Sequence, residues 1–299
     1  MPKSTPVSDL ITGTVIFNRM VQDIITKSVP LTLAQYRILF YLAISTDSYR
    51  RIRDISSFLF LSTSTVSDAA NHLEAHGLID KFDTPSDLKA VKLAITEKGI
   101  LELEEAWQAL LQGTEFYWDL LGEDTADHFL RVLPILFSKQ EIDSGMSSKV
   151  PPKAAYSFFS RIHLSSYVSW FKSTYNLSLI DVRILFLLSE ADEPLRISDI
   201  SHLLNEPASS ISSSTRNLSR VRKFITRSRN PSNRRETIIS LSSEGKTVAR
   251  EIMDRFTAFC CNDLNQTPEE FQKETLGRVH NRALPTMQDR LFGEKLSSW

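Results

Sequence analysis

The chain carries a basic stretch between residues 216 and 235 whose side chains could bind a polyanion. It holds no Asp or Glu, and its cations are Arg216, Arg220, Arg222, Lys223, Arg227, Arg229, Arg234 and Arg235. A solvated surface is the ordinary interpretation of a basic run, but acidic residues usually alternate with the cations of such a surface. Because no carboxylate in this run neutralises the guanidinium groups, we expect it to bind a nucleic-acid phosphate backbone.

The residues that lead into this stretch predict a short amphipathic helix over residues 208–221. Pro207 precedes its start, and apolar or buried-type side chains recur every three to four residues at Ala208, Ile211, Thr215, Leu218 and Val221. The opposite face carries hydroxyl, amide and guanidinium groups, which read base edges in the major groove of duplex DNA. The DNA-contact candidates on this helix are Ser209, Ser210, Ser212, Ser213, Arg216, Asn217 and Arg220.

A hairpin is predicted directly after this helix. Two short apolar runs, Phe224-Ile225 and residues 237–241, flank a polar Asn/Pro/Ser tip at residues 229–235. Arginines on a protruding hairpin meet phosphates or enter the minor groove. The candidates for this role are Arg227, Arg229, Asn233, Arg234 and Arg235.

Charge divides the chain into two unlike halves. The 299 residues are 41% apolar and 24% charged, which is typical of a soluble chain of about two domains, and the formal net charge is only −1. Residues 1–145 hold 13 Lys and Arg against 20 Asp and Glu, a net −7, whereas residues 146–299 hold 22 against 16, a net +6. This asymmetry indicates an anionic partner for the second half.

An internal repeat organises the rest of the chain. Residues 31–42 match residues 177–188, and both segments contain the sequence Arg-Ile-Leu-Phe. Further matches join residues 52–56 with 197–201, 64–67 with 209–212, 84–87 with 230–233, and 93–99 with 239–245. The offset stays at 145 to 146 residues throughout, which indicates a tandem duplication of one module.

Each copy predicts the same succession of elements. Helices that open on capping pairs are expected after Thr32, with Gln35, and after Ser178, with Asp181. The other expected helices lie at residues 8–27, 52–60, 97–112 and 125–137 in the first copy, and at 153–175, 197–204, 243–262 and 268–292 in the second, the last opened by Thr267 with Glu270. Residues 143–152 are rich in turn formers and are expected to link the copies.

Several short motifs then follow one another in a characteristic order. The first copy has Leu31-Thr32-Leu33-Ala34-Gln35, Leu73-Glu74-Ala75-His76-Gly77-Leu78-Ile79, Thr84-Pro85-Ser86-Asp87 and Ala94-Ile95-Thr96-Glu97-Lys98-Gly99. The second has Asn230-Pro231-Ser232-Asn233-Arg234-Arg235 and Leu241-Ser242-Ser243-Glu244-Gly245. With these motifs each copy resembles the MarR-type winged helix–turn–helix transcriptional regulators, and the resemblance covers nearly the whole chain twice.

The resemblance implies a fold and a way of assembling. Members of this family are usually homodimers whose first and last helices interleave, so two copies in one chain resemble a built-in pseudo-dimer, as in the two-domain regulators of the Sar group. We therefore expect a mainly α-helical fold with small β-hairpin wings, two winged helix–turn–helix domains at residues 1–145 and 146–299, and a monomer that acts as an intramolecular pseudo-dimer. A cytoplasmic protein associated with the bacterial nucleoid is expected, because no membrane span or signal peptide is visible.

The two copies depart from the family pattern in different ways. In the first copy, Leu88 and Lys89 replace the wing arginines, and acidic residues outnumber basic ones between Asn71 and Lys89. The first copy's candidates for DNA contact are Ser64, Thr65, Ser67, Asn71 and Lys89. In the second copy, Lys223 replaces the glycine that follows the recognition helix, with one extra residue before it, so we expect a remodelled turn there.

Other chemistry finds little support in the sequence. The residues His72 and His76 have metal-compatible spacing but no Cys or further His nearby, so exposed helix histidines are favoured over a metal site. Adjacent Cys260 and Cys261 form neither a zinc motif nor a disulfide framework, and buried inert thiols are favoured over a redox sensor. With only nine glycines and no phosphate loop or nucleophile elbow, we expect no enzyme activity, no cofactor and no metal.

The aromatic residues of the helix at 153–175 have two interpretations. Phe158, Phe159, Tyr167 and Trp170 could line a pocket for a small aromatic effector, as in ligand-responsive relatives, but at helical spacing they are more often core. The leading functional expectation is a sequence-specific double-stranded DNA-binding transcriptional regulator whose second copy dominates DNA contact. The alternative is a ligand-sensing or protein-interaction module in which DNA binding by the first copy is vestigial.

Overall fold

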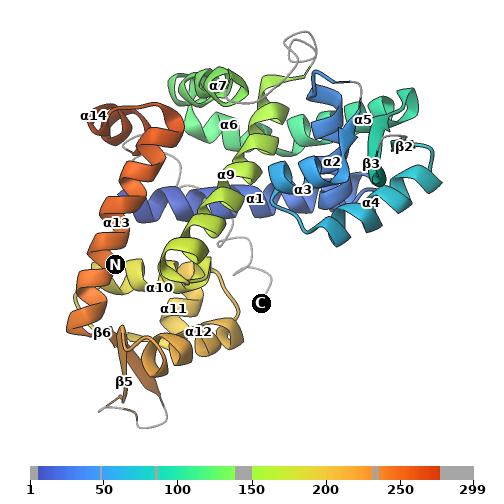
Figure 1. Cartoon of the computed structure of the whole chain (residues 1–299). Coiled ribbons are helices and arrows are strands. Elements are labelled where there is room, and N and C mark those ends of the chain that lie inside the picture. The colour runs from blue at the N-terminus through green and yellow to red at the C-terminus, as the bar shows by residue number, and fades with distance from the viewer. Residues whose placement is uncertain are drawn as a thin grey trace. The chain divides into compact units, whose positions relative to one another are not determined.

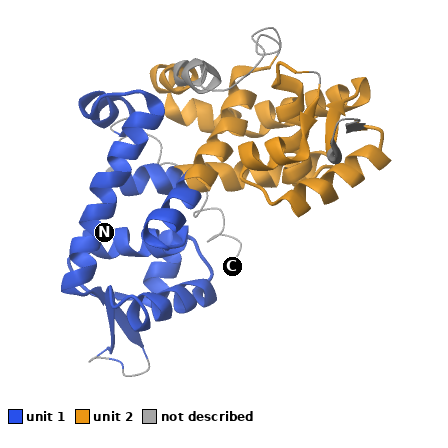
Figure 2. Ribbon diagram, in the orientation of Figure 1, with its two compact units in different colours: residues 1–13, 167–299 blue, residues 14–166 orange. Residues whose placement is uncertain are grey.

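The computed structural model of the chain is mainly helical, with small antiparallel sheets (Figure 1). It describes residues 6–47, 49–84, 87–138, 150–230, 233 and 236–276. The chain forms two compact units, residues 14–166 and residues 1–13 with 167–299 (Figure 2). The sequence repeat has its boundary at residues 145 and 146 instead, because it follows sequence similarity whereas the units follow contacts.

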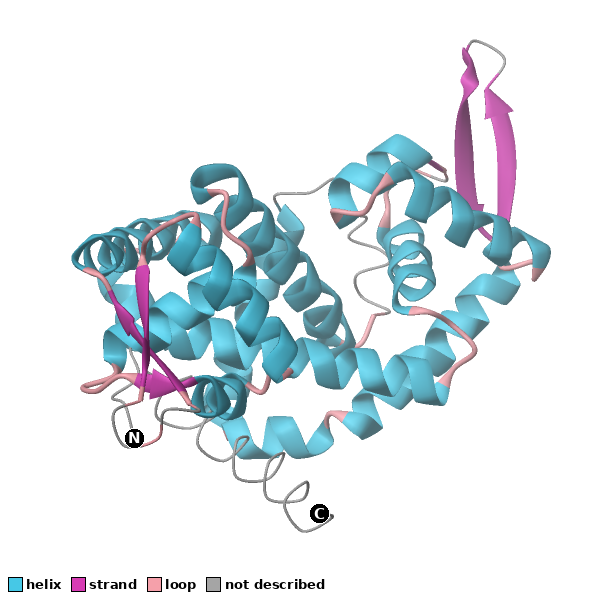
Figure 3. Cartoon of the chain, turned by 90° about the horizontal axis from the view of Figure 1, so that it is seen from below, coloured by secondary structure: helices cyan, strands magenta, loops and turns pink. Residues whose placement is uncertain are grey.

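The first succession of elements runs from α1 to α7. Its bounds are α1 Pro6–Ser28, α2 Leu33–Ile44, β1 Arg50–Arg51, α3 Ile52–Leu59, α4 Thr63–Ala75, β2 Ile79–Thr84, β3 Asp87–Ile95, α5 Glu97–Gly113, α6 Glu115–Leu121 and α7 Glu123–Ser138. The helix–turn–helix pair is α3 and α4, and β2 with β3 forms the wing. Figure 3 shows this wing as a long two-stranded ribbon that extends away from the helices of its unit.

The second succession repeats this order from α9 onwards. Its bounds are α9 Pro152–Tyr175, α10 Leu179–Glu190, β4 Leu195–Arg196, α11 Ile197–Leu204, α12 Ala208–Arg220, β5 Ile225–Arg229, β6 Thr237–Leu241, α13 Ser243–Leu264, α14 Pro268–Glu270 and a π-helix at Phe271–Leu276. Here α11 and α12 form the helix–turn–helix pair, and β5 with β6 forms the wing beside α12 (Figure 1).

Most predicted elements are confirmed, and three features differ. Sequence reasoning missed α6, and it missed the two-residue strands β1 and β4, which make each wing a three-stranded sheet of order β1-β3-β2 or β4-β6-β5. The helix expected at 268–292 is α-helical only over Pro268–Glu270 and π-helical over Phe271–Leu276. Its remaining residues, and most of the expected linker at 143–152, lie outside the described residues.

Two of the three predicted capping pairs position the helix that underlies the helix–turn–helix pair, and the third, Thr267 with Glu270, is confirmed at the start of α14. The Thr32 hydroxyl accepts from the Gln35 N–H and the Gln35 side chain accepts from the Thr32 N–H; Ser178 and Asp181 do the same for α10. Two such reciprocal bonds satisfy donors that a helix start otherwise leaves unpaired. They fix the first turn of helices whose remaining length is almost wholly buried.

A buried arginine in each copy then ties this helix to the next helix pair. Arg37 on α2 donates from Nη2 to the Leu59 carbonyl, and Arg183 on α10 donates from Nη2 to the Leu204 carbonyl at 2.7 Å. These carbonyls end α3 and α11, where helices leave acceptors unpaired. The arginine of the identical Arg-Ile-Leu-Phe segment therefore has the same structural role in both copies.

In each copy one hydroxyl at the end of the wing bonds to the turn that follows the recognition helix. Thr96 donates to the Gly77 carbonyl and Ser242 to the Lys223 carbonyl, both at 2.8 Å, and each hydroxyl also caps the following helix. The backbone adds Thr96 N to Leu78 O at 3.1 Å and Ser242 N to Phe224 O at 2.9 Å. The end of the recognition helix, the wing and the helix after the wing thus meet at one hydrogen-bonded joint.

This joint brings two backbones so close that only glycine fits. A Cβ placed on Gly245 would lie 1.8 Å from the Phe224 carbonyl oxygen, and one on Gly99 would lie 2.1 Å from the Leu78 oxygen. A real Cβ cannot approach a backbone oxygen this closely, so any side chain forces the helix after the wing away from the recognition helix. The glycine of the motifs Thr-Glu-Lys-Gly and Ser-Ser-Glu-Gly is a packing requirement.

The turn after α12 is remodelled, as the sequence predicted. Gly77 ends the first-copy turn with φ +71°, and Lys223 adopts the same left-handed conformation with φ +58°. Leu78 N bonds to Leu73 O five residues back, whereas Phe224 N bonds to Leu218 O six residues back, which accommodates the extra residue. A side chain in this conformation costs about 1 kcal/mol because its Cβ crowds the backbone.

Replacing Lys223 with glycine should therefore stabilise the chain. We expect Lys223→Gly to raise the free energy of unfolding by up to about 1 kcal/mol, since it removes the steric cost of positive φ. Lys246→Gly is the matched control, because Lys246 is exposed inside α13 and its replacement should destabilise by about 1 kcal/mol. Denaturant unfolding of the full chain measures both; a loss of stability in Lys223→Gly would contradict the interpretation.

Replacing Gly245 with alanine should disrupt the joint. We expect Gly245→Ala to lower the free energy of unfolding by roughly 1–3 kcal/mol, the usual range for overpacking, because its methyl group meets a backbone oxygen that cannot rotate away. Lys246→Ala changes the neighbouring exposed position and should alter stability little. Equal stabilities of the two variants in thermal unfolding would show that the close approach is unimportant.

Candidate nucleic-acid interface

The predicted recognition helix α12 presents most of its candidate residues to solvent. Ser209, Ser213, Arg216, Asn217 and Arg220 are exposed, whereas Ser210 and Ser212 are half-buried. Ile211, Thr215 and Leu218 are buried on the opposite face, as their spacing predicted. Ala208 and Val221, which the same spacing assigned to that face, are exposed, because they lie at the two ends of the helix. In the described part of the chain, the side chains of Ser209, Ser213 and Asn217 make no hydrogen bond, so their polar groups are available to a ligand.

A buried hydroxyl that sequence reasoning placed on neither face orients this helix. Ser214 is buried and donates to Oδ1 of Asp181, the same carboxylate whose Oδ2 closes the capping box of α10. One aspartate thus positions the start of α10 and the middle of α12 together. Its signal in the sequence was weak, because Ser214 stands in a run of serines and only its place beside Thr215 and Leu218 marks it as inward-facing.

The starts of the two recognition helices differ in their caps. The Ser62 hydroxyl caps α4 by accepting from Thr65 N, and it also lies 2.8 Å from Ser64 Oγ and 2.7 Å from Thr65 Oγ1. The N-cap of α12 is Pro207, which makes no side-chain cap. The first N–H groups of α12 are therefore left for solvent or for an anion, while the hydroxyls at the start of α4 bond to one another.

Arg227 links the wing to the recognition helix. From β5 its Nη1 donates to Thr215 Oγ1 at 3.0 Å and lies 3.5 Å from the Ser212 carbonyl, which also accepts from Arg216 Nε at 3.2 Å. Burial lowers the pKa of Arg227, and the positive charges of Arg216 and Arg220 lower it further. The helix and the wing therefore share one group of three cations that repel one another.

The remaining predicted wing residues are exposed or lie outside the described residues. Arg229 and Asn233 are exposed, whereas Arg234 and Arg235 are outside the described residues. Arg222 differs from its basic neighbours, because its Nη2 donates to the Asn176 carbonyl at 2.8 Å. This hydrogen bond connects the turn after α12 to the residue that follows α9.

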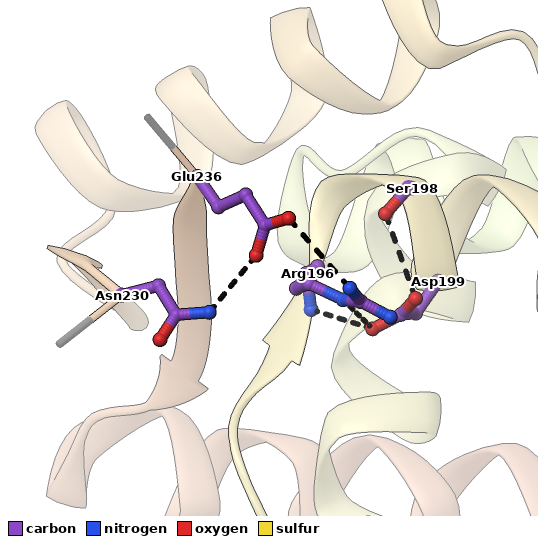
Figure 4. A network of polar contacts seen from close by, with 5 residues as sticks. All are labelled: Arg196, Ser198, Asp199, Asn230 and Glu236. Carbon is purple, nitrogen blue, oxygen red and sulfur yellow. Dashed lines mark hydrogen bonds and ion pairs between the residues drawn. The ribbon is translucent and has the colours of Figure 1, made fainter. Parts of the chain in front are cut away.

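A polar network holds the tip and base of this wing (Figure 4). Glu236 accepts from Asn230 Nδ2 at 2.9 Å and lies 3.7 Å from Nη1 of Arg196, whose Nε donates to Asp199 at 2.9 Å. The hydrogen bond from Arg196 lowers the pKa of Asp199. Sequence reasoning missed this network, because Arg196 and Asp199 lie far before Glu236 in the chain and only the pairing of β4 with β6 brings them together.

The first copy presents a different surface at the corresponding place. Ser64, Thr65 and Asn71 are exposed on α4 and Ser67 is half-buried, while the side chain of Lys89 lies outside the described residues. Lys81 on β2 contacts Glu74 Oε2 at 2.7 Å and Asn71 Oδ1 at 2.6 Å. Its positive charge is therefore compensated within the domain.

The four residues proposed for an effector pocket fall into two separate aromatic groups. Phe158 and Phe159 are buried, and Phe158 stacks on Phe40 with ring centroids 4.1 Å apart. Tyr167 and Trp170 belong to the other compact unit, where their ring centroids lie 4.9 and 5.8 Å from that of Phe256 in the same unit. These contacts are those of two hydrophobic cores, so the four side chains do not line one site within a unit.

The two histidines with metal-compatible spacing lie next to each other at the C-terminal end of α4. His72 and His76 stack with centroids 4.2 Å apart, and Nδ1 of His76 lies 2.8 Å from the His72 carbonyl. No group of three His, Cys, Asp or Glu side chains with metal-binding geometry occurs among the residues that the structure describes. The same residues form no helix long and apolar enough to cross a membrane.

Both cysteines are buried in α13, as favoured by their apolar surroundings. Cys260 is 1% and Cys261 6% exposed, and burial raises the pKa of both thiols, that of Cys260 well above its ordinary value. Because the thiolate is the reactive form, a raised pKa keeps the thiol protonated and slow to react at neutral pH.

The native chain should therefore resist thiol modification. At pH 7.5 we expect an aromatic disulfide reagent to react with the folded chain far more slowly than with the chain in denaturant, where both thiols are exposed and have ordinary pKa values. Absorbance of the released thiolate measures the reaction. Rapid modification of the folded chain at the rate of a small free thiol would show that a thiol is accessible and reactive.

Two domain-family models each match one part of the chain. Residues 29–90 match the model of the MarR family, and residues 177–245 match that of the winged helix DNA-binding domain. Each match spans the capped helix, the helix–turn–helix pair and wing strands described above. The chain carries two winged helix–turn–helix domains. No curated protein matches the chain.

Solved structures of three bacterial proteins are similar to parts of the chain. The BpsR protein of Bordetella bronchiseptica, solved in a study of the regulation of its DNA binding by 6-hydroxynicotinic acid, is 24% identical, covering 34% of this chain and 76% of its own, with a TM-score of 0.30. A mutant MarR from E. coli in complex with operator DNA is 15% identical over 33% and 72%, with a TM-score of 0.29. YusO of Bacillus subtilis is 22% identical with a TM-score of 0.28, and the match covers 31% of this chain and 64% of YusO.

Proposed function

We propose that the chain is a sequence-specific regulator of transcription that binds double-stranded DNA mainly through its second winged-helix domain. The observation that carries this proposal is the surface of α12 and its wing, where free hydroxyl and amide groups stand beside Arg216, Arg220 and Arg227. In the described part of the chain these three arginines contact no carboxylate. A major-groove helix needs polar groups for base edges and cations for the flanking phosphates, and this surface supplies both.

The contrast between the copies supports a dominant second domain. On α12 the start of the helix has no side-chain cap and the exposed Ser209 and Ser213 make no side-chain hydrogen bond within the described residues, whereas at the start of α4 the hydroxyls bond to one another. The overall charge of residues 146–299 is +6 and that of residues 1–145 is −7. Because non-specific DNA affinity comes from phosphate neutralisation, the first domain contributes little of it.

The repeat suggests how one chain could act alone. We propose that the copies at residues 1–145 and 146–299 serve as the two halves of an intramolecular pseudo-dimer, so that a monomer is the active species. An asymmetric contact with a non-palindromic site follows, since only one half is equipped to hold DNA strongly. The alternative is a protein-interaction module, which the acidic residues of the first copy, such as Glu74 and Asp80, favour.

Two substitutions on the second domain should separate base reading from phosphate binding. Asn217→Ala should relax sequence preference with little change in the salt dependence of affinity, because an amide contacts base edges. Arg229→Ala should weaken binding to every sequence and lower the slope of log affinity against log salt by about one, because it removes one phosphate contact. Fluorescence anisotropy of the full chain with selected and generic duplexes measures both.

Lys273→Ala is the control for this experiment, because it removes a charge from an exposed site beyond the end of α13 that is opposite to the wing. If Arg229→Ala and Lys273→Ala leave the same affinity and slope, the wing does not contact phosphates. If the unmodified chain binds no duplex even at low salt, the protein-interaction alternative replaces the regulator.

A further inference from the structure

The two recognition helices bury side chains at the same four positions of the repeat. These are Val66, Ala69, Ala70 and Leu73 on α4, and Ile211, Ser214, Thr215 and Leu218 on α12. The offset of 145 residues pairs Ala69 with Ser214 and Ala70 with Thr215. Two alanines, which have no polar side-chain atom, are therefore replaced by two buried hydroxyl groups in the second copy.

Each of these hydroxyl groups meets an ionisable side chain from a different element. Ser214 donates to Oδ1 of Asp181 on α10, and Thr215 Oγ1 accepts from Nη1 of Arg227 on β5 at 3.0 Å. Because α12 contacts both α10 and β5 (Figure 1), neighbouring positions on its inner face are held from two sides. A hydrogen bond with one charged partner is roughly twice as strong as one between neutral groups.

These bonds specify one position of α12. Oδ2 of Asp181 accepts from the Ser178 N–H and hydroxyl, and Thr215 Oγ1 donates onward to the Ile211 carbonyl at 2.8 Å. Apolar packing is non-directional and tolerates small shifts of a helix, whereas a hydrogen bond needs a defined distance and angle. If α12 slides or turns, buried polar groups lose their partners, and an unpaired buried polar group is costly.

We propose that Ser214 and Thr215 are positioning residues, which with Asp181 and Arg227 hold α12 in the orientation that lets its exposed face discriminate between DNA sequences. The inference rests on the proposed function. Base edges require defined hydrogen-bond geometry, whereas the attraction of phosphates to cations depends weakly on orientation. Loss of either hydroxyl therefore lowers sequence preference more than affinity. The helix α4 lacks this restraint, because alanines occupy both positions.

Two substitutions in the full chain remove one hydroxyl each. Ser214→Ala introduces the residue of the first copy, and Thr215→Val replaces the hydroxyl with a methyl group of similar size. For each, the ratio of affinities for a selected and a generic duplex should fall about fivefold or more, the size of one good base contact. The affinity for the generic duplex should change less than about twofold and its salt slope should stay the same, because no charge is removed.

Ile211→Val is the matched control, because it shortens a buried side chain of α12 and removes no hydrogen bond. Loss of a buried methyl group lowers the free energy of unfolding, so a fall in selectivity that merely follows stability would appear in this variant too. We expect Ile211→Val to keep the selectivity of the unmodified chain. Thermal unfolding shows whether every variant is folded at the assay temperature.

Asp181→Gln tests the carboxylate, since Gln35 forms the same capping box in the first copy with a neutral side chain. If Asp181 acts through Ser214, Asp181→Gln lowers selectivity, and Ser214→Ala then causes little further loss in the Asp181→Gln background. Losses that multiply in the double variant would overturn this link between the two residues.

The outcomes separate this inference from the proposed function. If the unmodified chain prefers the selected duplex but Ser214→Ala and Thr215→Val match Ile211→Val, the positioning role is wrong while DNA reading stands. If the unmodified chain prefers no duplex, the proposed function fails and hydrogen–deuterium exchange of the free chain decides. Amides of α12 should then exchange faster in both hydroxyl variants than in Ile211→Val, and equal exchange would overturn the restraint on α12.

Discussion

Each recognition helix depends on one hydrogen-bonded joint, at which a Ser or Thr hydroxyl binds the last carbonyl of the turn after that helix. In the second copy Ser242 donates to Lys223 O and caps α13 at Gly245 N, and Thr96 does the same with Gly77 O and Gly99 N in the first. The close approach at this joint excludes every side chain at Gly99 and Gly245. Because the recognition helix, the wing and the next helix all meet there, the same hydroxyl-to-carbonyl bond holds these three elements together in both copies, although the turn of the second copy is one residue longer.

On this shared framework the two copies differ in charge compensation. Glu74 neutralises Lys81 in the first, whereas Arg216, Arg220 and Arg227 have no carboxylate partner among the described residues of the second. An internal ion pair stabilises a partly exposed site only slightly, but it withdraws a cation from any external anion. The three cations of the second copy have the opposite character, because no described carboxylate compensates their mutual repulsion and a bound anion would reduce it.

The parts of this fold that arise from neighbouring residues could be predicted, and those that join distant residues could not. Thr32 with Gln35, and Ser178 with Asp181, mark helix starts because both members of each capping box lie within one turn. The exposed face of α12 followed from the spacing of Ile211, Thr215 and Leu218. In contrast, the contacts of Lys81 with Glu74 and of Arg227 with Thr215 depend on how the hairpin folds back over the helix. Charge counting recorded all of these ionic residues without showing which of them meet. The helix α6 was missed because Thr114 alone separates it from α5 and gives it no side-chain cap.

A hydroxyl-radical footprint on a duplex that the full chain selects from random sequences tests the central claim most directly. If the second domain holds DNA and the first does not, the sugar–phosphate backbone should be protected over one major groove and the minor groove beside it, with no symmetric second patch. Protection of two equal patches about 10 base pairs apart, the spacing at which paired domains contact successive major grooves, would contradict the account.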